Sequence, residues 1–156
     1  MADLTREQII YLIAMHSGKG LALRGVNLSW IDLRMLDLTE ANLALANLNA
    51  ATLCQAALDG ADMHQARIDY ADLSETSLKN ANLRDAILIG TDLRAADLTD
   101  ADLRAADLRG ANLRGAVLVR ANLWHADLRE ANLLYAKIDG AKGLPVEIYE
   151  QIKEKP

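Results

Sequence analysis

From residue 21 to residue 140 the chain repeats every five residues without insertion or deletion, giving twenty-four consecutive pentapeptides. The third residue of each, here called the centre, is Leu in twenty-one repeats and Met or Ile in the others. Two residues before the centre, eighteen of the twenty-four positions are Ala, and one residue before it sixteen are Asp or Asn. This unbroken period of five constrains the fold more than any other feature of the chain.

A period of five fits neither a single helix nor a single straight strand. On an α-helix each five-residue step rotates by roughly 140°, so the centres would be spread around the axis. On a continuous strand an odd step reverses the face each time, which would send alternate centres into water. The chain must therefore turn once in every repeat.

Within one repeat, the Ala and the centre lie two residues apart, so an extended backbone directs both side chains to the same side. A corner after each repeat lets every Ala and every centre fill one axial core, as in a solenoid. Six of the nine glycines occupy the last position of a repeat, where a tight turn favours residues that tolerate positive φ. The pattern predicts a tube with turns at regular intervals.

The first four repeats differ from the rest. The Ala position carries a larger residue at Leu21, Val26, Ile31 and Leu36, and is Ala from Ala41 onward in most repeats. Four repeats built differently correspond to one turn of a four-sided tube, and terminal repeats next to a cap are expected to be atypical.

The tandem motif of Ala, Asp or Asn, Leu and two variable residues resembles that of the pentapeptide-repeat family over residues 21–140. The resemblance implies an all-β fold: a right-handed quadrilateral parallel β-helix solenoid with four pentapeptides, or twenty residues, in each coil. Twenty-four repeats would then form about six coils. We expect a single domain, with an N-terminal capping helix in residues 1–20, the β-helix in 21–140, and a C-terminal capping helix and tail in 141–156.

Each end of the chain carries a helix signal. Thr5 with Gln8 forms a capping box, and Ile9, Leu12, Ile13 and His16 share one face, so a helix is expected near residues 5–16, stopped by Gly18. Pro145 suits a first helical turn, and apolar residues recur every four positions after it, so a second helix is expected near 145–153. The tail from Lys153 is expected to fray.

Composition narrows the setting. The formal net charge is −5, and the single cysteine, Cys54, excludes an internal disulfide and fits a reducing compartment. No apolar run is long enough to span a bilayer, and the start of the sequence lacks the features of a secretory signal. The sequence therefore predicts a cytoplasmic protein without a membrane segment.

No arrangement typical of an enzyme or a metal site is visible. His16 lies in the cap, and His64 and His125 are three coils apart in the expected register, so they cannot share an ion. Cys54 has no His beside it as an activating base, and no Gly-rich phosphate loop occurs. We expect a protein without catalytic residues, cofactor, metal or small-molecule substrate.

Six arginines of the C-terminal half each follow a centre, and most have an Asp nearby, as Arg104 has Asp102 and Arg129 has Asp127. This pattern indicates compensated surface charge rather than nucleic-acid binding, in keeping with a pI near 5.1.

Apolar residues at outward positions indicate a partner surface. The candidate partner-binding residues are Tyr70, Ile87, Ile89, Val117 and Val119. A second set is a candidate for contacts between copies of the chain, with packing under the C-terminal helix as the simpler interpretation of its last three members: Ile10, Met15, Trp124, Leu134 and Tyr135.

Three functions remain open at this point. The first is a non-enzymatic scaffold for an unidentified protein partner. The second follows from the resemblance: some members of the family mimic duplex DNA and bind DNA gyrase, giving quinolone resistance, although this chain has no Phe and few strongly acidic faces. The third is a self-assembling structural protein, as a homodimer through one of its ends.

Overall fold

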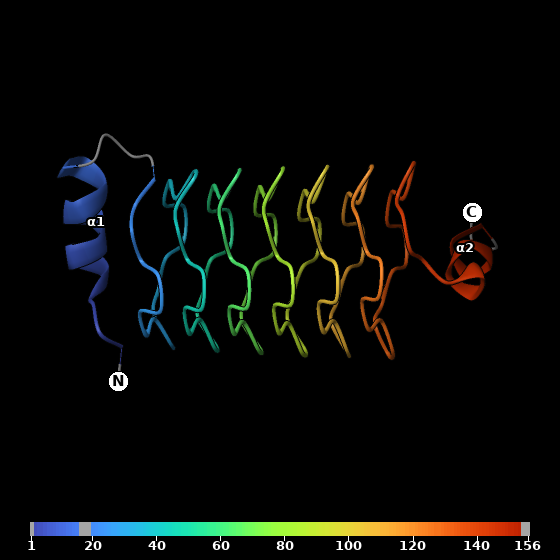
Figure 1. Ribbon diagram of the computed structural model, residues 1–156, viewed down its shortest axis with the longest axis horizontal. Helices are drawn as coiled ribbons and strands as arrows, with labels where there is room; N and C mark the ends of the chain where they lie inside the picture. Colours follow the sequence, from blue (N-terminus) through green and yellow to red (C-terminus); the bar gives the residue numbers. More distant parts are fainter. Residues whose placement is uncertain (1, 16–19, 154–156) are drawn as a thin grey trace.

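Backbone pairing at an interval of twenty residues builds the middle of the molecule. Parallel bridges join residue 22 to 42, 27 to 47, 32 to 52 and 37 to 57, and the same four columns continue to the bridge between 122 and 142. Each column is one wall of a four-sided tube, and each turn of twenty residues is one coil. The computed structural model describes residues 2–15 and 20–153, and Figure 1 shows the coils stacked into a rod with a helix at each end.

Each wall is extended over only a few residues before the next corner. In consequence the described residues contain isolated bridges, one in each repeat, and no longer strand. The Leu23 N–H donates to the Asn42 carbonyl at 2.8 Å, and the Asn42 N–H donates back to the Leu21 carbonyl at 2.9 Å. This exchange recurs from coil to coil, and in most repeats three N–H groups pair with neighbouring coils, while the first N–H donates to the preceding centre, as Ala41 does to Leu38 at 3.0 Å.

The corners require a left-handed backbone at every fifth residue. All twenty-four last positions of the repeats have φ between 55° and 70°, and eighteen of them are not glycine. None of the eighteen is Val, Ile or Thr, the types for which positive φ is most unfavourable. The corner N–H donates to the next coil, as Trp30 does to the Asn49 carbonyl at 3.0 Å, and this bond offsets part of the strain.

The axis of the tube is filled as the sequence predicts. Every centre from Leu23 to Leu133 is at most 8% exposed, and only the last centre, Ile138, is half-buried. Two positions that replace Ala with Thr are also buried. Their hydroxyls donate to backbone carbonyls, Thr76 to Leu73 and Thr91 to Ile68, so no polar group is left unpaired there.

Helix α1, Arg6–Met15, covers the first coil, with Ile9 fully buried against the core. The expected capping box is present, because the Thr5 N–H donates to Gln8 Oε1 at 2.7 Å and the Gln8 N–H donates to Thr5 Oγ1 at 3.3 Å. The predicted roles of His16 and Gly18 lie outside the described residues.

Helix α2, Val146–Lys153, covers part of the last coil, and the Tyr149 hydroxyl donates to the Ala141 carbonyl at 3.2 Å. Residues 154–156, where the sequence predicts fraying, are also outside the described part. Neither helix has the length and apolarity needed to cross a bilayer.

Candidate functional site

The Asp and Asn residues of the walls are used by the backbone. In all sixteen repeats that carry one before the centre, its side-chain oxygen accepts the N–H of the residue two positions later, at 3.0–3.3 Å. That N–H points out of the tube at the start of each corner and has no partner in the ladder. The conspicuous Asp and Asn ladders are therefore turn caps, and their presence by itself does not indicate chemistry.

Two turns without Asp or Asn are capped from the preceding coil. Arg67 and Ser77 stand at the capping position, and the N–H groups of Asp69 and Lys79 donate instead to Asn49 and Asp59, at 3.0 Å in both cases.

Five caps also form ion pairs with the Arg two positions later, at 2.5–2.8 Å. The predicted pairs of Arg104 with Asp102 and Arg129 with Asp127 are among them. The Arg129 side chain, by hydrogen bonding, lowers the pKa of Asp127 to about 2. Four of the six arginines that follow a centre in the C-terminal half are thus neutralised by a neighbouring Asp, whereas Arg84 and Arg114 follow an Asn cap.

The wall segments at Ile87 and Val117 lack a cap. Among the described residues, the N–H groups of Ile89 and Val119 donate no hydrogen bond, because an aliphatic side chain replaces the Asp or Asn. The sequence predicts that Ile87, Ile89, Val117 and Val119 are exposed, but the structure shows them less exposed than predicted. All four are half-buried, because side chains of the coils before and after stack on the same wall, as Arg67 and Asp107 do on Ile87.

Tyr70 is the strongly exposed member of the predicted partner surface, at 72%. It occupies a corner, and its ring lies over the next residue of that corner column, Gly90. A Cβ at Gly90 would be 2.7 Å from the Tyr70 ring, so the glycine is what lets the ring lie along the corner. Gly110 follows in the same column and leaves the backbone bare for a second coil.

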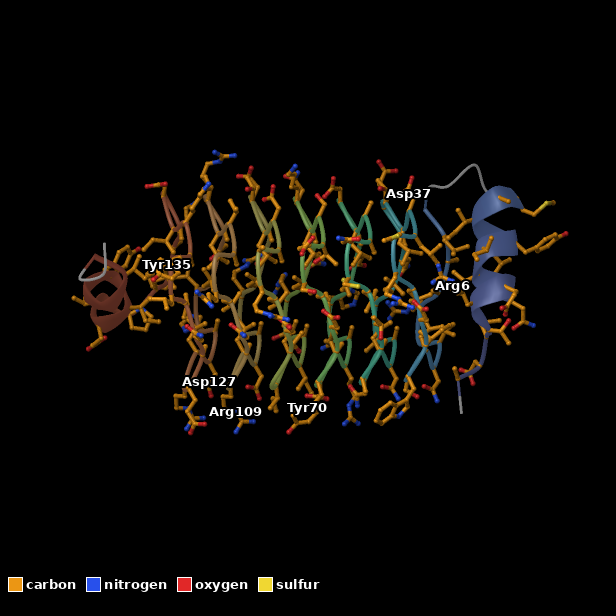
Figure 2. The ribbon with its side chains drawn as sticks, turned by 180° about the vertical axis from the view of Figure 1, so that it is seen from behind. Arg6, Asp37, Tyr70, Arg109, Asp127 and Tyr135 are labelled. Carbon is orange, nitrogen blue, oxygen red and sulfur yellow. The ribbon has the colours of Figure 1, made fainter. Side chains whose placement is uncertain are left out.

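This corner forms a trough of about 440 Å³. Its lining residues are Tyr70, Ile89, Gly90, Arg109, Gly110, Arg129 and Glu130. Figure 2 shows Tyr70, Arg109 and Asp127 along one edge of the rod, in the order of their coils. We call this surface the corner trough.

The corner trough combines an aromatic wall with hydrogen-bond donors. Arg109 uses Nε and Nη2 to bind Asp107, and Arg129 uses the same two nitrogens to bind Asp127, which leaves Nη1 of both free to donate outward. The uncapped N–H of Ile89 is a further donor. Such a surface suits carbonyl or carboxylate acceptors beside an apolar side chain, the groups that a polypeptide presents.

His64 is one of the two histidines of the repeats to be considered for a catalytic or metal-binding role. His64 Nδ1 lies 2.8 Å from Asp62 Oδ1, a contact that the sequence did not indicate, and Asn82 Nδ2 also donates to that oxygen. The hollow around them is lined by Asp62, His64, Gln65, Asn82, Arg84 and Asp85, without Ser, Thr or Cys. Cys54 lies elsewhere, with a pKa raised by burial, and no three His, Cys, Asp or Glu residues converge as metal ligands within residues 2–15 and 20–153.

Trp30 and Met35 are the most exposed of the apolar residues that the sequence interpretation missed. Trp30 is 82% exposed and Met35 is 73% exposed, and both are corner residues of the first coil. Their position in the repeat was the available signal, since every last position points outward.

The residues proposed for contacts between copies are divided between the two ends. Ile10 is 44% and Met15 is 65% exposed on α1, while Trp124 and Tyr135 remain about half exposed beside α2 and Leu134 is half-buried. The Arg114 guanidinium lies 5.4 Å from the centre of the Tyr135 ring. The backbone at Gly143 passes directly over the backbone of Trp124. A Cβ at Gly143 would lie 2.5 Å from the Trp124 backbone nitrogen.

The chain is similar to known proteins in sequence and in structure. A family model described as Pentapeptide repeats matches in eight copies, over residues 23–56, 46–85, 76–115 and 106–142. Among solved structures the chain is similar to HetL, a pentapeptide repeat protein involved in heterocyst differentiation regulation from the cyanobacterium Nostoc sp. strain PCC 7120. The identity is 32%, the TM-score is 0.49, and the match covers 79% of this chain and 67% of HetL.

Two further solved structures are similar. Rfr23, a pentapeptide repeat protein from the cyanobacterium Cyanothece 51142, is 28% identical with a TM-score of 0.29, over 85% of this chain and 95% of Rfr23. A trypsin-treated form of QnrB1, a plasmid-mediated fluoroquinolone resistance protein, is 19% identical with a TM-score of 0.41, over 80% of this chain and 71% of QnrB1. A search among curated proteins gave no significant match.

Proposed function

Because the chain belongs to the pentapeptide-repeat family, we propose that it is a non-enzymatic scaffold that binds another protein through the corner trough. The observation that carries this proposal is the meeting of three features at one corner. Tyr70 is exposed with its ring over Gly90, the Ile89 N–H is uncapped, and Gly110 leaves the backbone accessible before Glu130.

The trough has the composition of a protein contact. Tyr and Arg are over-represented among residues that dominate binding energy. The aspartates orient the two arginines, which reduces the side-chain entropy lost on binding a partner acceptor. An uncapped N–H gains a bond on binding that it lacks among the described residues, which favours a partner that presents a carbonyl or carboxylate there.

The rest of the architecture serves this surface. From family membership we propose a right-handed β-helix whose twenty-four repeats form about six coils. A rod of this kind presents its corner columns in register, about 4.8 Å per coil. It holds a partner segment against successive corners without rearrangement.

Binding of DNA gyrase as a duplex mimic is a weaker proposal. Mimicry of DNA requires rows of uncompensated negative charge, and aspartates on several walls are paired with arginine or lysine, as Asp100 is with Arg120 and Asp97 is with Lys79. A supercoiling assay with purified protein is expected to show no effect on gyrase, and inhibition at micromolar concentration would revive this alternative.

The test of the scaffold is affinity capture from the native host with the whole chain as bait. We expect a set of proteins bound by the wild type to be lost with Tyr70→Asp and with Ile89→Asp. Tyr135→Asp, at another exposed corner, is the matched control and should retain them. If Tyr70→Asp and Ile89→Asp recover the same proteins as the wild type, the corner trough is not the contact surface.

A further inference from the structure

Helix α1 is apolar around its whole circumference. Seven of its ten residues are apolar, in the unbroken run from Ile9 to Met15. The inner face is used, since Ile9 is fully buried and Ile13 packs against the core. The outer face carries Tyr11 at 63% and Met15 at 65% exposure. A helix that is apolar on all sides is normally covered on all sides.

The outer face of α1 is almost free of charge. Residues 2–15 contain three charged side chains, of which Asp3 and Arg6 are turned to the first coil: Asp3 accepts the Asn27 N–H at 2.7 Å, and Arg6 pairs with Asp32 at 3.1 Å. Glu7 alone remains outside. It lines, together with Leu4, Gln8, Tyr11 and Leu12, a hollow of about 380 Å³ whose surface is mainly apolar.

The opposite end of the rod is not a complementary surface. Helix α2 has the sequence VEIYEQIK, with acidic and basic residues along its length, and Val146 as its strongly exposed apolar side chain. Packing α1 against α2 of another copy would bring the exposed Glu147 carboxylate against apolar side chains, which is unfavourable. The apolar end of the rod therefore fits a second apolar end better than it fits the other end.

We propose that the outer face of α1 binds the same face of a second copy of this chain, joining two rods end to end about a two-fold axis. Helix α1 is the outermost element at its end of the rod, so two copies can meet there before any coil makes contact (Figure 1). An axis near the middle of α1 places Met15 of each copy opposite Leu4 of the other, over the apolar hollow. The two helices then run antiparallel with their dipoles opposed favourably, and Glu7 of each copy lies within the contact, one turn before Tyr11 on the same face.

The available area sets the strength of the contact. Ile10, Tyr11 and Met15 together expose on the order of 350 Å² of apolar surface in each copy, or about 700 Å² across the pair, below the 1,200–2,000 Å² of standard stable interfaces. The expected dimer is reversible and dissociates in the micromolar range. It is independent of the corner trough, which remains open in both copies.

Sedimentation velocity of the full chain from about 1 to 200 µM tests the proposal. We expect a concentration-dependent shift from monomer to dimer, and at least a tenfold weaker dimer with Tyr11→Asp or Met15→Lys. Val146→Asp, also at an exposed apolar residue but on α2, should leave the dimer unchanged. Thermal melting checks that each variant keeps its fold. If Tyr11→Asp does not fold, Met15→Lys serves as the second variant.

Two results would overturn this inference: a wild type that stays monomeric across the range, or a dimer that survives both α1 variants. A dimer broken by Val146→Asp or Tyr135→Asp instead would assign the contact to the other end. The capture experiment with Tyr70→Asp is separate, so the scaffold and the dimer can fail independently.

Discussion

The two ends of the rod close the same tube in different ways. At the N-terminal end, donors from the cap meet the outward carbonyls of the first coil. The Asp3 N–H donates to Asn27 at 2.6 Å, the Gly20 N–H donates to Thr39 at 3.2 Å, and Arg6 donates to the carbonyls of Asp32 and Arg34 at 2.8 and 3.1 Å. Figure 2 shows Arg6 extending from α1 toward the first coil. Ile9 fills the end of the core completely.

The last coil is left open on three of its walls. Within the described residues, seven of its backbone N–H groups donate no hydrogen bond, although the equivalent groups of earlier coils all donate to the coil that follows. They belong to His125, Leu128, Glu130, Leu133, Tyr135, Ile138 and Gly140. Only the wall at Leu123 is continued, by the Lys142 carbonyl at 2.8 Å, and the core residue Ile138 is half-buried.

The difference teaches that a uniform repeat need not have uniform stability. Stability in a solenoid is approximately a sum of contacts between neighbouring coils, so a coil with one neighbour depends on its cap. The N-terminal coil receives bonds and a buried side chain from its cap, and the C-terminal coil receives less of both. We expect the rod to open from its C-terminal end.

The largest difference between the two ends should appear when a charged residue is placed in the core at each end in turn. Ile9→Asp buries a carboxylate without a partner and should lower the free energy of unfolding by roughly 3–5 kcal/mol. Ile138→Asp reaches water and should cost much less. Urea denaturation followed by circular dichroism measures both. Equal losses would mean that the two ends are sealed alike.

Hydrogen exchange should separate the ends without any substitution. The N–H groups of Leu128 and Leu133 are expected to exchange at least about a hundredfold faster than those of Leu28 and Leu33, which are bonded in the ladder. Exchange monitored residue by residue by NMR gives the comparison. Equal protection at both ends would show that the last coil has an acceptor that the geometry does not provide.

A smaller effect is expected from the polar contacts of the two caps. Arg6→Ala removes two bonds from a charged donor to backbone carbonyls and should lower the free energy of unfolding by about 1–2 kcal/mol. Tyr149→Phe removes one neutral bond at the other cap and should cost about 0.5–1 kcal/mol. Chemical denaturation of the two variants in parallel tests the order, which a larger loss for Tyr149→Phe would reverse.

The smallest effect concerns pH. Arginine hydrogen bonds lower the pKa of Asp32 near one end and that of Asp127 near the other, the latter to about 2. A carboxylate with a lowered folded pKa stabilises the fold above its unfolded pKa, about 4, and this contribution disappears as pH falls through the folded pKa. Both pairs are exposed and screened by salt, so the loss between about pH 5 and pH 2 should be slight.

NMR titration of the side-chain carboxyls measures this directly. Arg129→Gln should return the pKa of Asp127 toward its ordinary value. Arg114→Gln, whose residue has an Asn two positions earlier, should leave it unchanged. A wild-type pKa near 4 for Asp127 would show that Arg129 does not lower the pKa of this carboxyl group.

The inward residues were predictable because burial depends on their spacing. The Leu centres, the Ala positions and the twenty-residue register follow from a period of five together with the family resemblance, and the structure places them as expected. Glycines such as Gly25 allowed the positive φ of the corners to be predicted. The same conformation at Trp30 and Met35 was not predicted. Those residues are apolar, and apolar type alone indicates burial, whereas their position in the repeat decides exposure.

The contacts between distant residues were not predictable. Arg6 reaches Asp32 across twenty-six residues, and nothing local in either sequence indicates that pairing. The turn-capping role of the Asp and Asn residues was overlooked because they were counted as surface charge. For the same reason the missing cap before Ile89, which lines the corner trough, was visible in the sequence only as an apolar residue at an outward position.

The twenty-residue register also dictates how such a rod can change length. Inserting or deleting one residue would misalign every later wall, whereas removing residues 81–100 would bring residue 101 into the place of residue 81 and leave all four columns continuous. The length of the rod can therefore change only by whole coils. A partner that binds several corners must have binding groups spaced by multiples of one coil.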